Sequence, residues 1–262
     1  MGAPELRIAS LVPSSTELVC ALGLAPYLVA RTGFCTHPKA LLENTPKVGG
    51  TKDVNLQRLQ LFRPSHVLMN EEENRLETHA AVRQWPGVQC LVSFPRAPAD
   101  VPGLIAELAE AFSAIPGVQE KAARLLAELQ LALDRPAPTP PRRVLYLIWR
   151  QPWMLAGSDT YIARLLAQAG WLVLAPETAR YPELPADDPL WQAADEVWLS
   201  SEPYSFGAEH LREVQNLAPQ ARVRLVDGEL CSWWGARTAA GLAYLHGLHQ
   251  TENEPPWNST NR

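Results

Sequence analysis

The sequence lacks the features of two common functional classes. Its 262 residues carry 23 lysines and arginines against 28 aspartates and glutamates, so the net charge is −5, and no basic run is present. Non-specific nucleic-acid binding depends on neutralising phosphates with such side chains, so no nucleic-acid partner is expected. No apolar stretch approaches the roughly 20 residues needed to cross a bilayer, so no membrane span is expected either.

Paired cysteines are absent as well. Cys20, Cys35, Cys90 and Cys231 are scattered and form no CxxC motif. A structural zinc site or a disulfide scaffold is therefore poorly supported. Cys20 and Cys90 lie among apolar residues, where buried thiols are common. Cys35 and Cys231 stand beside polar and aromatic residues in expected loops, which makes them the two cysteines with a candidate site role.

Motifs for common catalytic chemistry are missing too. The sequence contains no Gly-x-Ser-x-Gly, no GxxxxGK[ST] and no HExxH. We therefore expect a binding protein that requires no cofactor, and not an enzyme. The N-terminal MGAPEL also lacks the basic segment of a secretory signal. On this numbering we expect a cytoplasmic protein, or a periplasmic one if a leader was removed.

What the sequence does contain is an alternation of short apolar strands and helices. Strands are predicted at residues 7–12, 27–31, 66–69, 88–92, 144–149, 171–174, 196–199 and 223–226. Helices are predicted at 16–22, 56–62, 76–85, 161–169, 209–217 and 238–249, and Ser14, Ser15 and Thr16 are each able to cap the first of them. Such alternation is typical of a mostly parallel sheet with helices on both faces.

The clearest helix is predicted over residues 117–134. Val118, Ala122 and Leu129 recur at helical spacing, and charged residues occupy the other faces. The segment PAPTPPRR ends this helix, because proline has no N–H and blocks continuation. We therefore predict an α/β lobe at 1–115, a backbone helix at 116–135, a second α/β lobe at 136–250 and a flexible tail at 251–262.

Candidate ligand-binding residues follow from this organisation. Ligands of open parallel sheets bind beyond the carboxyl ends of the strands. Aromatic side chains in such loops suit a flat, partly apolar ligand, although the tryptophans are equally suited to sealing the interface between lobes. The loops contain Phe34, Cys35, His37, Glu71, Glu72, Trp149, Trp153, Glu202, Tyr204, Phe206, Trp233, Trp234 and Arg237.

The polar members of this set leave alternatives open. His37 is a candidate base or metal ligand, or simply a polar turn residue. The glutamates at 71–73 and Glu202 are candidates for a carboxylate pair or a hard-metal site, or they form solvated turns. Arg237 is a candidate clamp for a carboxylate or phosphate, or a partner in a surface salt bridge. No catalytic residue is assigned, and metal ligands stay undetermined.

An ordered series of motifs resembles one known family. The series comprises RIASLVPSSTELVCALGL, RTGFCTHP, PKVGGTKDVNLQRL, LFRPSHVLMNEEENR, IWRQPWMLAGSDTYI, SSEPYSF and DGELCSWWGAR. In this order they are similar to the cobalamin- and iron-chelate-binding proteins of bacterial ABC importers, the helical-backbone metal receptors. Within that family the series is most similar to the vitamin B12-binding branch. The resemblance covers about residues 6–248, which is nearly the whole chain.

The resemblance implies the class III periplasmic-binding-protein fold. This is an α/β fold of two Rossmann-like lobes, each with a mostly parallel sheet, joined by a single long backbone helix. It further implies that a cobalamin-like corrinoid or related metal chelate binds in the inter-lobe cleft. The alternatives are a siderophore, haem or metal ion as ligand, or an enzyme acting on a corrinoid-like ligand in the same cleft.

The chain matches the family's residue types at some functional positions and differs from them at others. Phe34 falls where the B12-binding branch has a cleft tyrosine, whereas Thr51 and Asn70 fall where it has tryptophans. Its acid and arginine near the C-terminal motif fall at Glu229 and Trp233. Family members dock on an ABC permease through one glutamate per lobe. Those positions correspond to Gln57 and to Asp187 or Asp188, and a permease is the implied partner.

Overall fold

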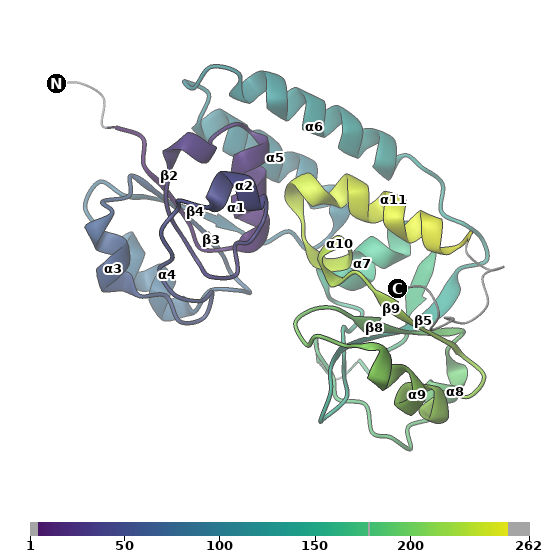
Figure 1. Cartoon of the computed structure of the whole chain (residues 1–262). Coiled ribbons are helices and arrows are strands. Elements are labelled where there is room, and N and C mark those ends of the chain that lie inside the picture. The colour runs from purple at the N-terminus through teal and green to yellow at the C-terminus, as the bar shows by residue number, and fades with distance from the viewer. Residues whose placement is uncertain (1–4, 178, 251–262) are drawn as a thin grey trace. The chain divides into compact units, whose positions relative to one another are not determined.

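The computed structural model describes residues 5–177 and 179–250 of the chain (Figure 1). The tail predicted at 251–262 lies outside the described residues. The chain divides into two compact units: unit 1 contains Met1–Pro95, Asp100–Glu128 and Trp234–Arg237, and unit 2 contains Arg96–Ala99, Leu129–Trp233 and Thr238–Arg262. The boundary falls inside the longest helix, α6 (Val118–Leu133).

Unit 1 is built on a four-stranded parallel sheet. Its strands are β1 (Ile8–Ser10), β2 (Leu28–Arg31), β3 (His66–Asn70) and β4 (Gln89–Ser93), in the order β2-β1-β3-β4. Its helices before α6 are α1 (Pro13–Ala21), α2 (Lys39–Leu42), α3 (Leu56–Leu61), α4 (Leu76–Arg83) and α5 (Val101–Ala111). The buried face of the sheet packs Ala9, Val67 and Met69 against Leu59 and Val82 of the helices.

Unit 2 is built on a five-stranded mixed sheet. Its strands are β5 (Arg142–Trp149), β6 (Met154–Leu155), β7 (Trp171–Val173), β8 (Glu196–Ser200) and β9 (Arg222–Val226). The order is β6-β5-β8-β9, β7 also pairs with β5, and only β6 is antiparallel to its neighbour. Its helices are α7 (Tyr161–Gln168), α8 (Leu190–Ala193), α9 (Ala208–Leu217), α10 (Gly228–Ser232) and α11 (Thr238–Leu248).

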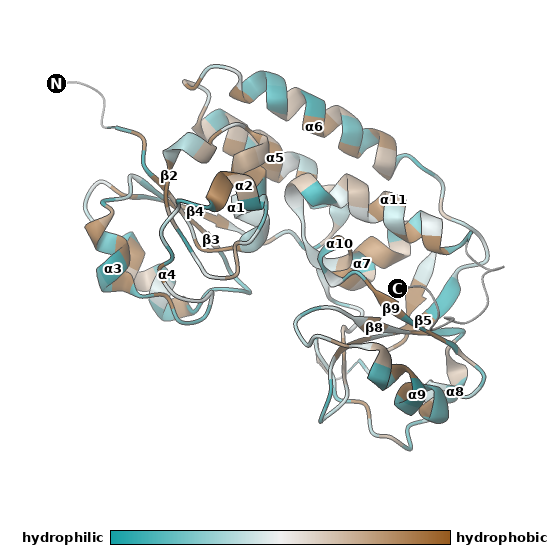
Figure 2. Cartoon of the chain, viewed as in Figure 1, coloured by the Kyte–Doolittle hydropathy of each residue, from teal (hydrophilic) through white to brown (hydrophobic). Residues whose placement is uncertain are grey.

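The predicted α/β class, with mostly parallel sheets, is confirmed. Several strands are coloured brown in Figure 2, which marks hydrophobic residues. The central residues of β5 and β8, 144–147 and 197–199, are fully buried. The outer helix α6 alternates between polar and apolar residues in the same view. In the described part of the chain, every helix falls short of the length and apolar character needed to span a bilayer.

The start of α1 differs from the prediction. The helix begins at Pro13, and its N-cap residue Val12 makes no side-chain cap. Ser14 and Ser15 lie inside the first turn, and the Thr16 hydroxyl donates to the Val12 carbonyl 2.9 Å away, so none of the three is the cap. Proline suits this position because its missing N–H would have no partner in the first turn of a helix.

One buried and two half-buried histidines are expected to make the protein less stable in mild acid. Burial lowers the pKa of His66 in unit 1 and of His246 and His249 in unit 2. These rings take up protons less readily in the folded protein than in the unfolded chain, whose histidines become protonated below a pH of about 6.5. Their stabilisation is therefore complete above that pH and is lost as the pH falls, by up to about 1.4 kcal/mol per pH unit for each histidine.

Urea unfolding between pH 7 and pH 5 measures this effect in a range where carboxylates stay ionised. The matched variant is His246→Leu, because His246 Nε2 is buried and lacks a hydrogen-bond partner among the described residues. The variant should reduce the slope of stability against pH. An unchanged slope would assign the pH dependence to other groups.

Candidate functional site

In unit 1 the loop after β2 presents one aromatic side chain to solvent. Phe34 is 63% exposed, and its ring covers Gly50, where an added Cβ would lie 3.2 Å from Phe34 Cε2. The loop after β2 is also joined to the segment that contains Gly49 and Gly50, since the Gly33 N–H donates to the Gly49 carbonyl at 2.7 Å. An exposed ring on a braced loop is able to contact a ligand at little cost in ordering.

The Arg31 side chain holds the loop after β2 through hydrogen bonds. This buried guanidinium donates from Nη1 to the carbonyls of Thr32 and Cys35, at 3.3 and 2.9 Å, and from Nη2 to that of Leu42 at 3.3 Å. Cys35 itself is fully buried, 3.1 Å from the Thr32 hydroxyl, and burial raises the pKa of its thiol. The sulfur therefore faces the protein interior, and both residues serve to hold the loop.

Two buried asparagines fix the loop after β3. The Asn70 side-chain oxygen accepts from the N–H groups of Glu72 and Glu73, at 2.9 and 3.1 Å. Asn74 donates to the carbonyls of Leu11 and Thr51, at 3.3 and 2.9 Å, and so ties three loops together. Asn70, which stands where the resemblance implies a ligand-stacking tryptophan, is thus a structural residue in this chain.

The acidic turn after β3 faces outward. Glu71 is exposed and Glu72 is half-buried, and the Glu72 carbonyl accepts from Lys52 Nζ at 2.6 Å. His37 is also half-buried, in the loop that carries Phe34. Within residues 5–177 and 179–250, His, Cys, Asp and Glu side chains do not gather in groups of three that could hold a metal ion.

The segment Trp234–Arg237 belongs to unit 1. Arg237 forms a two-pronged ion pair with Glu17 of α1, at 2.9 Å from Nε and 2.7 Å from Nη2. Trp234 is buried beside Leu18 of the same helix and lines a cavity described below. These residues connect the segment to α1. A surface salt bridge was one of the two roles predicted for Arg237; the pair with Glu17 is a salt bridge, but a largely buried one.

In unit 2 the carboxyl ends of β5 and β8 carry a continuous aromatic cluster. Trp149 is 41% exposed and meets Tyr204 edge-on at 5.5 Å between ring centroids. Tyr204 packs on Phe206 at 4.7 Å, and Phe206 stacks on Trp153 at 6.2 Å. Trp153 in turn contacts the core residue Trp191. The cluster thus runs from the core to an exposed edge formed by Trp149 and Tyr204.

His210 orients the Tyr204 hydroxyl. The Gly207 N–H donates to His210 Nδ1 at 2.9 Å, so this nitrogen is an acceptor. The neutral ring therefore carries its proton on Nε2, which lies 3.3 Å from the Tyr204 oxygen. Tyr204 accepts this hydrogen bond, and the Arg150 side chain also hydrogen-bonds to Tyr204. No motif or spacing in the sequence indicated this role of His210.

Glu202 and Trp233 form a second polar feature of unit 2. The Trp233 indole N–H donates to Glu202 Oε2 at 3.0 Å, and the Glu202 N–H donates to the Ser200 hydroxyl at 3.2 Å. Trp233 directly follows α10, and both Trp233 and Trp234 are buried in a segment that is not a strand. Cys231 is buried nearby, and burial raises its pKa to about 12.

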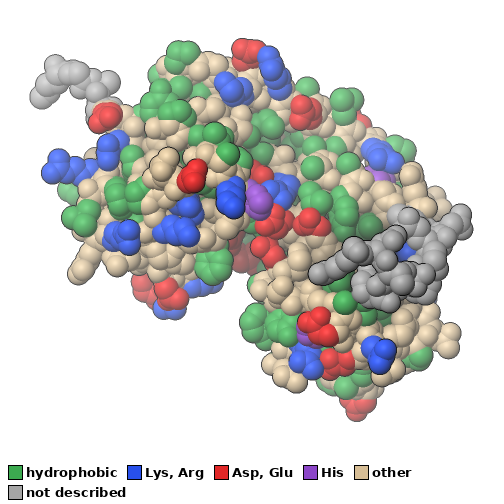
Figure 3. All heavy atoms as spheres, viewed as in Figure 1, with side chains coloured by type: hydrophobic (Ala, Val, Ile, Leu, Met, Phe, Trp, Pro, Cys, Tyr) green, Lys and Arg blue, Asp and Glu red, His purple; other side chains and the backbone are tan. Residues whose placement is uncertain are grey.

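Charged side chains of both signs are mixed on the face shown in Figure 3.

Over residues 8–219 the chain matches the family described as periplasmic binding protein, and it belongs to that family. The family assignment made from the ordered motifs is confirmed.

The chain is also similar to individual proteins of known sequence or structure. A vitamin B12-binding protein of Photorhabdus laumondii is 24% identical over 230 residues, covering 86% of this chain and 80% of that protein. The structure of the periplasmic vitamin B12 binding protein BtuF of Vibrio cholerae has a TM-score of 0.81 at 20% identity, covering 96% of this chain and 99% of that chain. A periplasmic heme binding protein from Pseudomonas aeruginosa has a TM-score of 0.79 at 22% identity, with coverage of 95% and 94%. The class III periplasmic-binding-protein fold is thereby confirmed.

Proposed function

We propose that this protein binds a cobalamin-like corrinoid or a related metal chelate, as the substrate-binding protein of an ABC importer or a relative of one. The exposed edge formed by Trp149 and Tyr204 carries the proposal. A flat macrocycle offers a broad apolar face to such rings, and Phe34 presents a similar surface in unit 1. The B12-binding relatives support a corrinoid in particular.

Haem is the second candidate ligand. Tyrosine oxygen is one of the ligands that proteins use for haem iron, and Tyr204, which packs against the exposed Trp149, is hydrogen-bonded to His210. The likeness to the Pseudomonas aeruginosa heme binding protein supports this candidate. A bare metal ion has less support, since the described carboxylates, thiols and imidazoles do not gather in groups of three that could hold one.

Mixing the purified protein with cyanocobalamin, cobinamide or ferric haem tests the proposal. Binding is expected to shift the visible spectrum of the chelate and to quench tryptophan fluorescence, because Trp149 lies at the proposed contact. Saturable changes with a corrinoid support the leading candidate, and changes with haem alone support the second. If none of the three changes either signal, the metal-chelate proposal is wrong.

Removal of the exposed indole should weaken chelate binding. Trp149→Ala is expected to cost about 1–3 kcal/mol of binding free energy, the range for losing an aromatic contact in an interface. Titration calorimetry with the chelate identified above measures it. Trp149→Phe should keep most of the affinity, and Leu172→Ala, an exposed apolar residue on β7, should keep all of it. Equal losses in all three variants would contradict a stacking role for Trp149.

Transport would require a permease partner. The proposed docking positions are accessible, since Gln57 lies exposed on α3 and Asp187 is exposed before α8. Asp188 instead accepts the Leu190 N–H at 2.9 Å. Fractionation of cells that express the untagged gene tests the importer role, because recovery from the periplasm supports it and recovery from the cytoplasm supports a relative with another task.

A further inference from the structure

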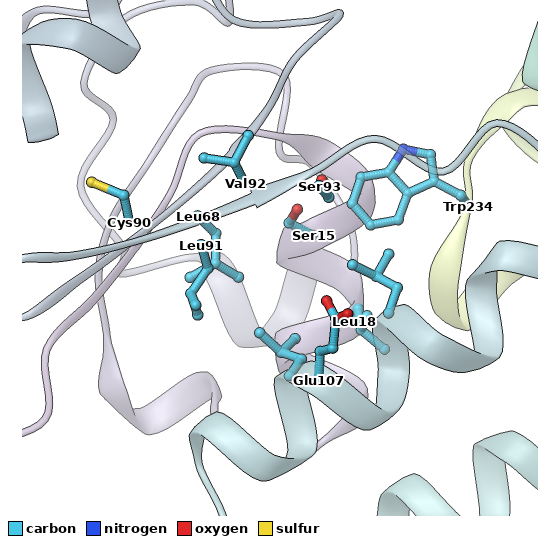
Figure 4. A pocket seen from close by; sticks show the side chains of 11 residues that line it. Ser15, Leu18, Leu68, Cys90, Leu91, Val92, Ser93, Glu107 and Trp234 are labelled. Carbon is cyan, nitrogen blue, oxygen red and sulfur yellow. The ribbon is translucent and has the colours of Figure 1, made fainter.

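A cavity of about 190 Å³ lies within unit 1, between α1, α5 and the strands β3 and β4 (Figure 4). All its lining residues belong to unit 1, and Trp234 is the only one of them that the sequence analysis selected as a ligand-binding residue. The walls are mainly apolar: Leu18, Leu68, Leu91, Leu104, Leu108, Val92 and Trp234. In Figure 4 the six-membered ring of Trp234 points toward Ser15.

Two polar groups at this cavity lack partners. Ser15 is only 4% exposed, yet its hydroxyl makes no hydrogen bond with any residue that the structure describes. Glu107 stands exposed on α5 at the rim and, within the same described residues, forms neither an ion pair nor a hydrogen bond. The Ser15 hydroxyl is thus available as a hydrogen-bonding group for a ligand in the cavity.

We propose that this cavity is a second binding site, which takes a small apolar amine. The negative charge of Glu107 selects a cation, and the Trp234 ring adds the attraction of an aromatic face. The Ser15 hydroxyl supplies a further hydrogen bond to the polar end of the ligand. An apolar cavity of about 150 Å³ accommodates benzene, so this cavity suits one ring with a short aminoalkyl chain.

The site does not depend on the metal-chelate proposal. It uses none of Phe34, Trp149 or Tyr204, and its ligand has no visible absorption. Chelate binding measured by visible spectra should therefore be the same with and without the amine, and either proposal is able to fail alone.

Titration calorimetry with 2-phenylethylamine tests the proposal. Two ligands of similar shape serve as probes of charge: 2-phenylethanol is neutral and phenylacetate is anionic. The amine should bind to the protein at least about tenfold more tightly than the alcohol, in keeping with a charge-assisted hydrogen bond, and phenylacetate should bind more weakly still. Absence of heat with millimolar amine, or equal affinity for amine and phenylacetate, would overturn the proposal.

Variants on one helix separate a specific contact from a general charge effect. Glu107→Gln should lower amine affinity about tenfold and leave the affinity for 2-phenylethanol unchanged. Glu110→Gln removes the same charge from an exposed position of α5 that does not line the cavity, and it should change neither affinity. Equal losses in the two variants would show that Glu107 makes no contact with the amine.

A filled cavity provides the last control. Leu104→Trp replaces a half-exposed wall residue with a larger one and should abolish binding of both the amine and the alcohol. Circular dichroism checks that the variant is folded. A folded Leu104→Trp protein that still binds the amine would place the amine elsewhere and contradict the proposed site.

Discussion

Replacing Glu196 with glutamine is expected to lower the free energy of unfolding of unit 2 by about 3–5 kcal/mol, the usual cost of breaking a buried ion pair. Glu196 on β8 is 3% exposed, and its Oε1 accepts from Arg224 Nη2 at 2.7 Å. Its Oε2 accepts from the Trp198 indole N–H at 2.6 Å. Burial lowers the pKa of Arg224, so the glutamine variant would leave a costly buried charge without its carboxylate. Urea unfolding followed by tryptophan fluorescence measures the loss.

The neighbouring residue provides a matched control. Asp195 pairs with Arg143 at 2.6 Å, but both side chains are close to half-exposed. Asp195→Asn should therefore cost less than about 1 kcal/mol. The double variant Glu196→Met with Arg224→Met should recover much of the stability, because removing both charges avoids the unpaired guanidinium. A glutamine variant of Glu196 no less stable than Asp195→Asn would contradict the importance assigned to burial.

The strands and the long helix were predictable because their residues repeat at regular spacing. Continuous apolar runs such as Val144–Leu147 belong to strands buried on both faces, and α6 shows its apolar residues at helical intervals. Helix α5 escaped prediction although Ile105 and Leu108 are spaced for a helix. Pro102 and Gly103 near its start resemble a loop, yet proline is well tolerated in a first helical turn.

The location of the candidate site was predictable, but its internal support was not. Phe34 and Tyr204 follow strands and Trp149 is the last residue of one, so the rule that ligands bind at the carboxyl ends of strands selects them. Asn74 acts through carbonyl groups of two other loops, and its bond to Leu11 joins residues 63 positions apart. Such contacts depend on how the chain folds back on itself, and no local pattern reports them.

Replacement of Gly49 in unit 1 is also expected to have a large effect. Its φ is +105°, a conformation that side-chain-bearing residues rarely adopt, and a Cβ there would overlap the Asp53 carbonyl oxygen. Gly49→Ala combines backbone strain with overpacking and is expected to cost about 3 kcal/mol of unfolding free energy. Urea unfolding of the variant measures this cost.

Ligand binding should report the same change. The Gly49 carbonyl accepts from Gly33, and the adjacent Gly50 lies under the Phe34 ring, so a displaced loop releases the exposed aromatic side chain of unit 1. We expect Gly49→Ala to weaken binding of the chelate that the spectra identify, even under conditions where the variant stays folded.

Two other glycines of unit 1 separate the effect of backbone strain on stability from the effect of steric overlap. Gly87 also has a positive φ, of +73°, but an added Cβ meets no atom within 4 Å, so Gly87→Ala should cost only the strain of about 1–2 kcal/mol. Gly103 in α5 has neither feature, and Gly103→Ala should gain about 0.5–1 kcal/mol from better helix propensity. A Gly49→Ala protein no less stable than Gly87→Ala would show that the loop absorbs the overlap by moving. In that case Phe34 would rest on a yielding loop, and its alanine variant should change chelate affinity little.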